Sequence, residues 1–332
     1  MKAAFIKEQG PPDVIQFGEL PNPVPTDKQV LVKAGAVAVN PIDTYIRGGL
    51  VATKPAFPYV IGCDLAGTIE AVGSGVKNFK PGDRVWGSNQ GLLGRAGTFS
   101  ELVAVDEEWL YPSPSQASDV DLAATALVGI TAHLGLFLHA DLKPGQRVFV
   151  NGGSGGVGSA VVQLAAANGA TVVTTAGDAA KVEFCKSIGA TAALNYREAD
   201  FESNLQATVK NEGGFDVWFE TLREPNPERT IPLMNTRGRI VLMAGRNARP
   251  ILPVGPTYVN DLRFIGFAMF NATAAEQSEC AAELNRLFAE GRFKANVGKV
   301  LPLAEAAEAH RLQEEKTLSG QGSLRGKIVL EP

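Results

Sequence analysis

The sequence predicts an α/β protein with two parts, a barrel-like β part and a doubly wound parallel sheet. Three observations carry this prediction. The first third of the 332-residue chain holds apolar, β-rich runs separated by Gly and Pro. Residues 147–270 alternate apolar strands with helical stretches, which is typical of a parallel sheet covered on both faces. The glycine-rich run NGGSGGVGSA (151–160) lies between a predicted strand and a predicted helix.

The β-rich part comes first in the chain. Its expected strands are QVLVKAGAVAVNP (29–41), LAGTIEAVG (65–73), GDRVWG (82–87) and FSELVAV (99–105). The next run, residues 120–140, is apolar and long enough to cross a membrane. Because it contains Asp121 and two histidines and stands alone, a buried helix is favoured over a membrane span.

The parallel sheet follows from the alternating elements after residue 146. The expected strands are 147–151, 170–177, 215–221, 238–245 and 262–270, and the expected helices between the first of them are 157–169 and 178–189. The tail is expected to form two helices, at 274–291 and 303–315, and a last strand at 325–331.

Composition narrows the possible partners. A net charge of -4 without a long basic run disfavours nucleic acid or an anionic membrane surface as the main partner. The amino-terminal residues lack the long apolar stretch of a signal peptide. Cys63, Cys185 and Cys280 are far apart and form no disulfide framework, so a cytoplasmic location is expected.

The glycine run predicts a dinucleotide site. Gly153, Gly155 and Gly158 fit the spacing G-x-G-x-x-G, which alone is a weak signal in a chain with 36 glycines. The strand before it and the helix after it supply the context that the mechanism needs: a tight turn, close approach of the backbone to pyrophosphate, and free N–H groups at the helix start. The alternative is a purely structural turn.

The second strand of the sheet indicates which dinucleotide is bound. An NAD site usually has Asp or Glu at the end of this strand. Here Thr175, Ala176 and Gly177 occupy that place, and Lys181 follows one helical turn later. The absent carboxylate and the lysine favour the 2′-phosphate of NADPH over NADH. Asp178 is close enough to act as the acid if the turn is shifted.

Three stretches carry a resemblance to a known family. The runs NPIDTYIRGG, GCDLAGTIEAVGSGVKNFKPGDRVWG and NGGSGGVGSAVVQLAAANGA resemble the medium-chain dehydrogenase/reductase superfamily, and within it the zinc-independent quinone oxidoreductases related to zeta-crystallin. The resemblance implies a GroES-like domain (1–121 and 271–332) with an inserted Rossmann domain (122–270), and an active site in the cleft between them. It also implies a homodimer or homotetramer, often paired through the last Rossmann strand.

The resemblance implies that no metal is bound. Zinc alcohol dehydrogenases carry Gly-His-Glu where this chain has Gly62, Cys63 and Asp64, and a cysteine ligand near the position of Asn40. The segment after Val85 holds no cysteine, so the four-cysteine lobe is missing as well. Cys63 is expected to be a small buried residue.

The family's site residues carry over by position. Asn40 and Tyr45 would face the nicotinamide and the substrate, and are the expected catalytic residues. The expected cofactor contacts are Asn40, Thr131, the loop Gly153, Ser154, Gly155, Gly156 and Val157, the 2′-phosphate pocket Gly177, Lys181 and Tyr196, and Thr221, Ala244, Gly245 and Phe267. One departure is Val51, which stands where several relatives carry a tyrosine.

Three further residues have plainer interpretations. Asp43 is expected to bond to nearby backbone rather than to act in catalysis. His133, on an apolar helix, is expected to be a core residue. For Arg47, an ordinary surface charge and a functional role are both open.

The leading functional hypothesis is NADPH-dependent hydride transfer to a quinone or an α,β-unsaturated carbonyl, with Tyr45 as the candidate proton donor. One alternative is a 2-alkenal or enoyl-thioester reductase, for which Arg223, Arg246 and Arg249 are possible contacts to a carrier phosphate. A second alternative is an NADPH-binding protein with a structural or RNA-binding role, although the acidic net charge disfavours RNA.

Overall fold

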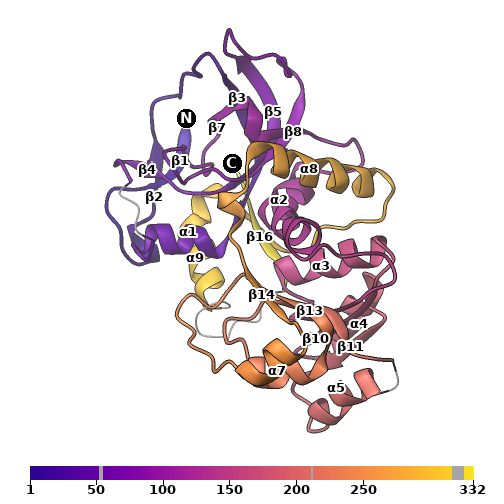
Figure 1. Ribbon diagram of the computed structural model, residues 1–332. Helices are drawn as coiled ribbons and strands as arrows, with labels where there is room; N and C mark the ends of the chain where they lie inside the picture. The colour runs from indigo at the N-terminus through magenta and orange to yellow at the C-terminus, as the bar shows by residue number, and fades with distance from the viewer. Residues whose placement is uncertain (52–54, 211, 316–324) are drawn as a thin grey trace. The chain divides into compact units, whose positions relative to one another are not determined.

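The structure, a computed structural model, describes residues 1–51, 55–210, 212–315 and 325–332. It divides into two compact units, whose elements are labelled in Figure 1. The first unit combines Met1–Leu127 with Thr273–Pro332, and the second unit is Val128–Ala272. The second unit is therefore an insertion in the chain of the first.

The first unit is built on two β-sheets. A three-stranded sheet has the order β2-β1-β4, and a seven-stranded sheet has the order β15-β16-β3-β5-β6-β8, with β7 also paired to β3. All pairs are antiparallel except β15 with β16. The strands are β1 (Lys2–Ile6), β2 (Gln16–Glu19), β3 (Gln29–Val39), β4 (Tyr59–Val60), β5 (Asp64–Val72), β6 (Arg84–Gly87), β7 (Leu102–Asp106), β8 (Leu110–Pro112), β15 (Val297–Pro302) and β16 (Lys327–Glu331).

The four strands predicted in the first third are confirmed as β3, β5, β6 and β7, and the predicted last strand is confirmed as β16. The expectation of strands without a helix between them is wrong, because α1 (Pro41–Arg47) follows β3 directly. Local chemistry explains this helix. Pro41 occupies its first position, and the backbone N–H of Asn40 donates to the carboxylate of Asp43 at 2.7 Å.

Two longer helices of the first unit agree with the predicted tail. They are α8 (Ala274–Ala289) and α9 (Ala306–Glu314). Thr273 caps α8 by accepting a hydrogen bond from the Glu276 N–H at 3.2 Å. Single-turn helices are η1 (Pro12–Val14), η2 (Glu107–Trp109) and η6 (Leu303–Glu305). The core of the unit packs α9 against strand residues such as Val32, Leu65 and Ile69 and against Phe99, each at most 1% exposed.

The second unit is a six-stranded, wholly parallel sheet in the order β11-β10-β9-β12-β13-β14. Its strands are β9 (Arg147–Asn151), β10 (Thr171–Ala176), β11 (Ala192–Asn195), β12 (Phe215–Glu220), β13 (Met234–Leu242) and β14 (Arg263–Gly266). Its helices are α3 (Gly156–Ala167), α4 (Ala179–Ser187), α5 (Phe201–Lys210), α6 (Pro227–Thr230), η4 (Ile231–Leu233), α7 (Val254–Val259) and η5 (Met269–Asn271). Helices α3 and α4 both pack against strand β10 (Figure 1).

The predicted parallel sheet is confirmed, with two corrections. The last strand was expected at 262–270 but ends at Gly266, so Phe267 follows the strand instead of lying in it. The sequence also missed β11 and α5. A four-residue strand that is half-buried at every position is too short to show a period. The rings of Phe149 and Trp218 stack in the core of this unit at 3.9 Å between centroids.

The apolar run at 120–140 forms α2 (Asp119–His133), which continues as a π-helical turn, η3 (Leu134–His139). By length and composition it is the one helix among the described residues that could cross a membrane. Its most apolar window is 72% buried inside the protein, which agrees with the predicted core helix. His133 packs its ring on Phe137 at 4.7 Å between centroids.

Candidate active site

The glycine turn links β9 to α3, as predicted. Gly152 has a φ of +91°, which only glycine adopts without strain. A Cβ on Gly158 would lie 2.1 Å from the Gly152 carbonyl oxygen, so a side chain there would force the turn open. The residues between them, 154–157, are all partly exposed. The helix start is thus open to an anionic group, and the backbone can approach it closely.

The second strand ends in a glycine beside an exposed tyrosine ring. Gly177 follows β10, and a Cβ there would lie 2.5 Å from the hydroxyl oxygen of Tyr196. Tyr196 is 46% exposed, and the Arg197 guanidinium carbon lies 5.8 Å from its ring centroid. The structure therefore brings Gly177 and Tyr196 into contact, with a cation beside them. Arg197 was missed in the sequence because LNYRE shows no strand period.

Asp178 caps α4 and does not replace the missing strand-end carboxylate. It accepts a hydrogen bond from the Lys181 N–H at 2.8 Å, and its other oxygen lies 3.0 Å from Lys181 Nζ. The backbone and side-chain hydrogen bonds from Lys181 lower the pKa of Asp178. Lys181, predicted as a cation that attracts the 2′-phosphate, thus forms an ion pair with its own helix cap. Its side chain is one-quarter exposed.

Four other predicted contacts lie after strands of the parallel sheet. Thr221 follows β12 and donates its hydroxyl hydrogen to the Asn151 carbonyl. Ala244 and Gly245 follow β13, and Gly245 has a φ of +86°. Phe267 follows β14 and packs on His139 at 4.6 Å between ring centroids. The carboxyl ends of parallel strands share one edge, so these residues lie on the same edge as the glycine turn. Thr131, on α2, is 4% exposed.

A group of buried polar side chains surrounds Asn40 in the first unit. The Asn40 amide nitrogen donates to Asp64 at 2.8 Å, and its oxygen accepts from the Lys327 ammonium. Lys327 also donates to the Val39 carbonyl at 2.7 Å and lies 4.0 Å from Asp64. Ser88 donates to the other Asp64 oxygen at 2.6 Å. Both ends of the Asn40 carboxamide are therefore engaged inside this unit.

Asp43 and Cys63 complete this group. The charged cluster, as we call it, consists of six residues that are each at most 5% exposed: Asn40, Asp43, Cys63, Asp64, Ser88 and Lys327. The predicted local role of Asp43 is confirmed by its bond from the Asn40 N–H. The predicted burial of Cys63 is confirmed too. Sequence reasoning missed Lys327, although a lysine inside the apolar run GKIVL is a signal for a buried, paired cation.

Burial dominates the electrostatics of the charged cluster. It raises the pKa of Asp43 to about 7 and raises the pKa of Asp64 above its usual range. The thiol of Cys63 has a pKa well above its usual value because of burial and the two carboxyl groups beside it. Burial lowers the pKa of Lys327, and the neighbouring carboxylates oppose that shift. The ammonium thus serves as the cation that offsets two buried acids.

Tyr45 differs from Asn40 in its exposure. It lies on α1 and is partly exposed, whereas Asn40 is fully buried. Arg47, on the same helix, is not the surface charge that one interpretation allowed. It is 3% exposed and forms an ion pair with Glu314 of α9, which ties α1 to that helix. Val51 is half-buried, and the next residues, 52–54, lie outside the described part of the chain.

Family comparisons agree with this architecture. Residues 26–115 match the alcohol dehydrogenase GroES-like domain, and residues 156–289 match the family described as zinc-binding dehydrogenase. Human quinone oxidoreductase is 34% identical over 331 residues, which cover 99% of this chain and 97% of that protein. The chain belongs to the quinone oxidoreductase family of the medium-chain dehydrogenase/reductases. It is an oxidoreductase.

Solved structures place this family member among pyridine-nucleotide enzymes. The structure of Escherichia coli quinone oxidoreductase complexed with NADPH matches with a TM-score of 0.83 and 27% identity, over the full length of both chains. An NAD-dependent alcohol dehydrogenase matches with a TM-score of 0.87 and 30% identity, again over both whole chains. The fold alone therefore does not distinguish an NADPH site from an NAD site. The residues at the end of β10 must decide between them.

Proposed function

We propose that this protein uses NADPH to reduce a quinone or an α,β-unsaturated carbonyl compound, without a catalytic metal. The observation that carries the proposal is the pair of features at one sheet edge: an open glycine turn, and a second strand that ends in Gly177 beside Tyr196. Bound NADPH supplies the hydride. The chain's own residues bind and orient the cofactor and the acceptor.

The choice of NADPH over NADH rests on charge at the end of β10. A ribose with free hydroxyls is best held by a carboxylate there, and Asp178, the carboxylate next to Gly177, is bonded to its own helix. The cations Lys181 and Arg197 and the exposed face of Tyr196 suit a 2′-phosphate. Gly177 leaves room that a side chain would fill.

Metal independence rests on the charged cluster. Zinc is bound by deprotonated thiolates, neutral imidazoles or carboxylates that converge on one point. The Cys63 thiol is held in its protonated form, and Asp64 is already bonded to Asn40 and Ser88. No group of three or more His, Cys, Asp or Glu side chains suited to a metal occurs in the described ranges. The Lys327 ammonium provides the buried positive charge instead.

Tyr45 is the proposed partner of the acceptor oxygen. Of the two predicted catalytic residues it is the one with an accessible side chain, and α1 holds it in place through Asp43 and Arg47. Its hydroxyl can donate a hydrogen bond to a carbonyl or quinone oxygen. The enolate or hydroquinone anion can also take its proton from water, so no strong acid is required.

We also propose a homodimer paired through β14. This strand is at the end of the six-stranded sheet, with a neighbour on one side only among the described residues. The preceding segment exposes a set of large apolar side chains between 45% and 69%: Ile251, Leu252, Val254, Tyr258 and Val259. An open edge with an apolar margin suits pairing with a second copy. Light scattering of the wild type and of Tyr258→Arg, which is expected to be monomeric, tests it.

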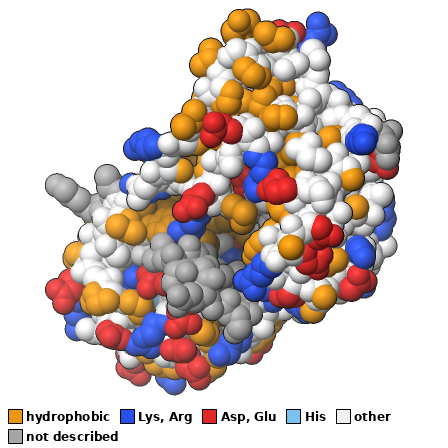
Figure 2. All heavy atoms as spheres, turned by 90° about the horizontal axis from the view of Figure 1, so that it is seen from below, with side chains coloured by type: hydrophobic (Ala, Val, Ile, Leu, Met, Phe, Trp, Pro, Cys, Tyr) orange, Lys and Arg blue, Asp and Glu red, His pale blue; other side chains and the backbone are white. Residues whose placement is uncertain are grey.

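Two other properties follow the same proposal. The three cysteines are unpaired and buried, which suits the reducing cytoplasm. Acidic and basic side chains are interspersed on the face in Figure 2, which suits a small-molecule substrate better than a nucleic-acid partner.

The test is NADPH oxidation with a panel of 1,2- and 1,4-quinones, enals, enones and crotonyl-coenzyme A, each repeated with NADH. Rapid turnover of quinones or enones with NADPH is expected. Turnover of the thioester alone would move the protein to the enoyl-thioester reductases. Cofactor binding without turnover of any acceptor would favour a non-catalytic role.

A further inference from the structure

Three buried side chains link the carboxyl ends of neighbouring strands directly behind the glycine turn. Asn151 ends β9, Glu220 ends β12, and Thr175 lies near the end of β10. The Asn151 amide nitrogen donates to both Glu220 oxygens, at 3.0 and 2.9 Å. The Thr175 hydroxyl donates to the Asn151 oxygen at 2.9 Å and accepts from the Gly152 N–H at 2.9 Å. We call Glu220, Asn151 and Thr175 the amide relay.

The direction of each bond in the relay is fixed by chemistry. An ionised carboxylate only accepts hydrogen bonds, so Asn151 must turn its NH2 group toward Glu220. Its oxygen then faces Thr175, whose single hydroxyl hydrogen is used in that bond. The remaining lone pairs of the Thr175 oxygen point to Gly152. The negative charge of Glu220 therefore orients Asn151, and Asn151 in turn orients the Thr175 hydroxyl. As a result, the Thr175 oxygen is available to accept from the Gly152 N–H.

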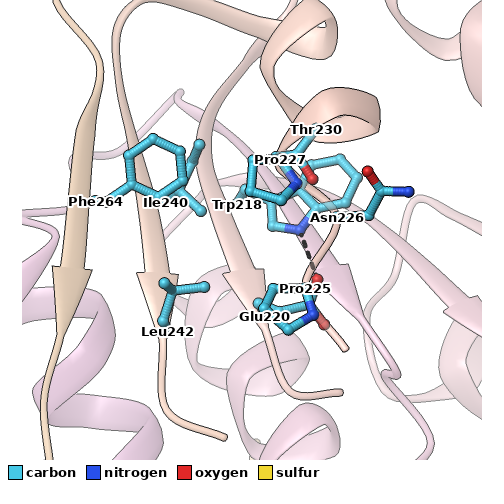
Figure 3. A pocket seen from close by; sticks show the side chains of 9 residues that line it. All are labelled: Trp218, Glu220, Pro225, Asn226, Pro227, Thr230, Ile240, Leu242 and Phe264. Carbon is cyan, nitrogen blue, oxygen red and sulfur yellow. Dashed lines mark hydrogen bonds between the residues drawn. The ribbon is translucent and has the colours of Figure 1, made fainter. Parts of the chain in front are cut away.

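Glu220 is itself held firmly. It is 2% exposed and also accepts from the Trp218 indole N–H at 3.2 Å and from the Leu222 N–H at 2.9 Å. Figure 3 shows the Trp218 bond to Glu220 at the wall of a small pocket that Ile240, Leu242 and Phe264 also line. Burial raises the pKa of Glu220, and the hydrogen bonds from Asn151, Leu222 and Trp218 oppose that shift. Arg229 also attracts this carboxylate electrostatically, which lowers the pKa of Glu220.

The relay ends on the residue that shapes the turn. Gly152 has the positive φ, its carbonyl accepts from the Gly155 N–H at 3.1 Å, and its oxygen is the atom that excludes a side chain at Gly158. Rotation of the backbone at Gly152 would therefore alter the whole turn. A second bond, from the Gly153 N–H to the Thr175 carbonyl at 3.0 Å, holds the peptide that carries the Gly152 carbonyl to the same strand.

We propose that Glu220, Asn151 and Thr175 are positioning residues that hold the glycine turn in the conformation that receives the cofactor's pyrophosphate. This inference rests on the proposed function, because it needs a dinucleotide at the turn. The three side chains are each at most 3% exposed, so the relay is placed to act on the turn and not on the cofactor directly. It acts by keeping the Gly152 peptide ordered before binding, so that less ordering is required when the cofactor enters.

Two neighbouring threonines give a matched test. Thr175→Val removes the relay hydroxyl. Thr174→Val removes an equally buried hydroxyl from the same strand, one that donates to the Val150 carbonyl at 2.7 Å and lies outside the relay. NADPH affinity is measured by titration calorimetry, together with kcat, KM and thermal unfolding. We expect the Kd and the KM for NADPH to rise about tenfold in Thr175→Val, with kcat at saturation within about twofold of the wild type. Thr174→Val removes no bond of the relay, although its side chain packs against Gly153, and a smaller rise in Kd than in Thr175→Val is expected.

Glu220→Gln is the second variant. It replaces one acceptor with a donor that opposes the Asn151 NH2 group, and the same rise in Kd is expected, about tenfold or more. Equal Kd values in Thr175→Val, Thr174→Val and the wild type would overturn the inference, as would a fall in kcat without a change in Kd. If the wild type binds neither NADPH nor NADH, it is the proposed function that fails. Thermal unfolding separately identifies any variant that does not fold.

Discussion

The two units bury polar groups in opposite ways. The charged cluster of the first unit holds an ammonium and two carboxyl groups, and the ammonium offsets the acids. The amide relay of the second unit holds one carboxylate, which accepts hydrogen bonds from the N–H groups of Asn151, Trp218 and Leu222. The first arrangement joins β3, β5, β16 and α1, whereas the second ends on a peptide of the glycine turn. Loss of a residue is therefore expected to damage folding in the first unit and cofactor binding in the second.

The largest effect is expected when the Lys327 ammonium is removed from the charged cluster, and it concerns the stability of the protein. Lys327→Met would leave Asp64 and the Asn40 oxygen without their cation in a fully buried site. Breaking a buried ion pair from one side costs about 3–5 kcal/mol, so a loss of that size in the free energy of unfolding is expected. Chemical denaturation measures it. The control is Lys299→Met on β15, where the side chain is exposed. A loss below about 1 kcal/mol in Lys327→Met would contradict the role of the ammonium.

The pH dependence of stability sharpens the same point. The pKa of Asp43 is raised from 3.8 to about 7 in the folded protein, so the folded state holds this proton more tightly than the unfolded chain does. Its contribution therefore becomes less favourable as the pH rises from about 4 to 7, by up to about 4 kcal/mol. Asp43→Asn removes that titration. The stability of the wild type relative to this variant is expected to fall between pH 4 and pH 7, measured by denaturation at each pH. A constant difference would show that Asp43 does not titrate there.

The sequence predicted the second unit better than the first, for physical reasons. Parallel strands buried on both faces, such as β9 and β12, read as continuous apolar runs, and the glycine spacing needs only local context. The charged cluster could not be predicted, because Lys327 and Asn40 are 287 positions apart and meet only through strand pairing. The relay was hidden for the same reason. Asn151 and Glu220 are 69 positions apart, and neither residue type alone indicates a contact.

A smaller effect is expected at the end of β10, and it bears on the cofactor instead of on folding. Lys181→Ala removes a cation from the proposed 2′-phosphate pocket, and the KM for NADPH is expected to rise about tenfold while that for NADH stays unchanged. Lys186→Ala is the matched control, since Lys186 lies on the same helix and also pairs with an acid three residues earlier. Steady-state kinetics with both cofactors measure the effect. An equal change for NADPH and NADH would remove Lys181 from the pocket.

The smallest effect, a change in kcat, is expected at Tyr45 on helix α1. Tyr45→Phe removes the proposed hydrogen bond to the acceptor oxygen, and a fall in kcat of no more than about tenfold is expected, because water can supply the proton. Tyr111→Phe removes a buried hydroxyl that has no hydrogen-bond partner within the described ranges, and it serves as the control. The comparison is made at saturating NADPH. An unchanged kcat in Tyr45→Phe would assign proton delivery to solvent alone.

The most direct test of the account is the initial rate of quinone reduction by protein that has been dialysed against a strong zinc chelator, measured with NADPH and with NADH. The account predicts full activity after chelation, and a higher kcat/KM with NADPH than with NADH. Loss of activity that zinc restores would contradict the assignment of Lys327 as the buried cation of this site. A preference for NADH would contradict the interpretation of Gly177, Lys181 and Tyr196 as the 2′-phosphate pocket.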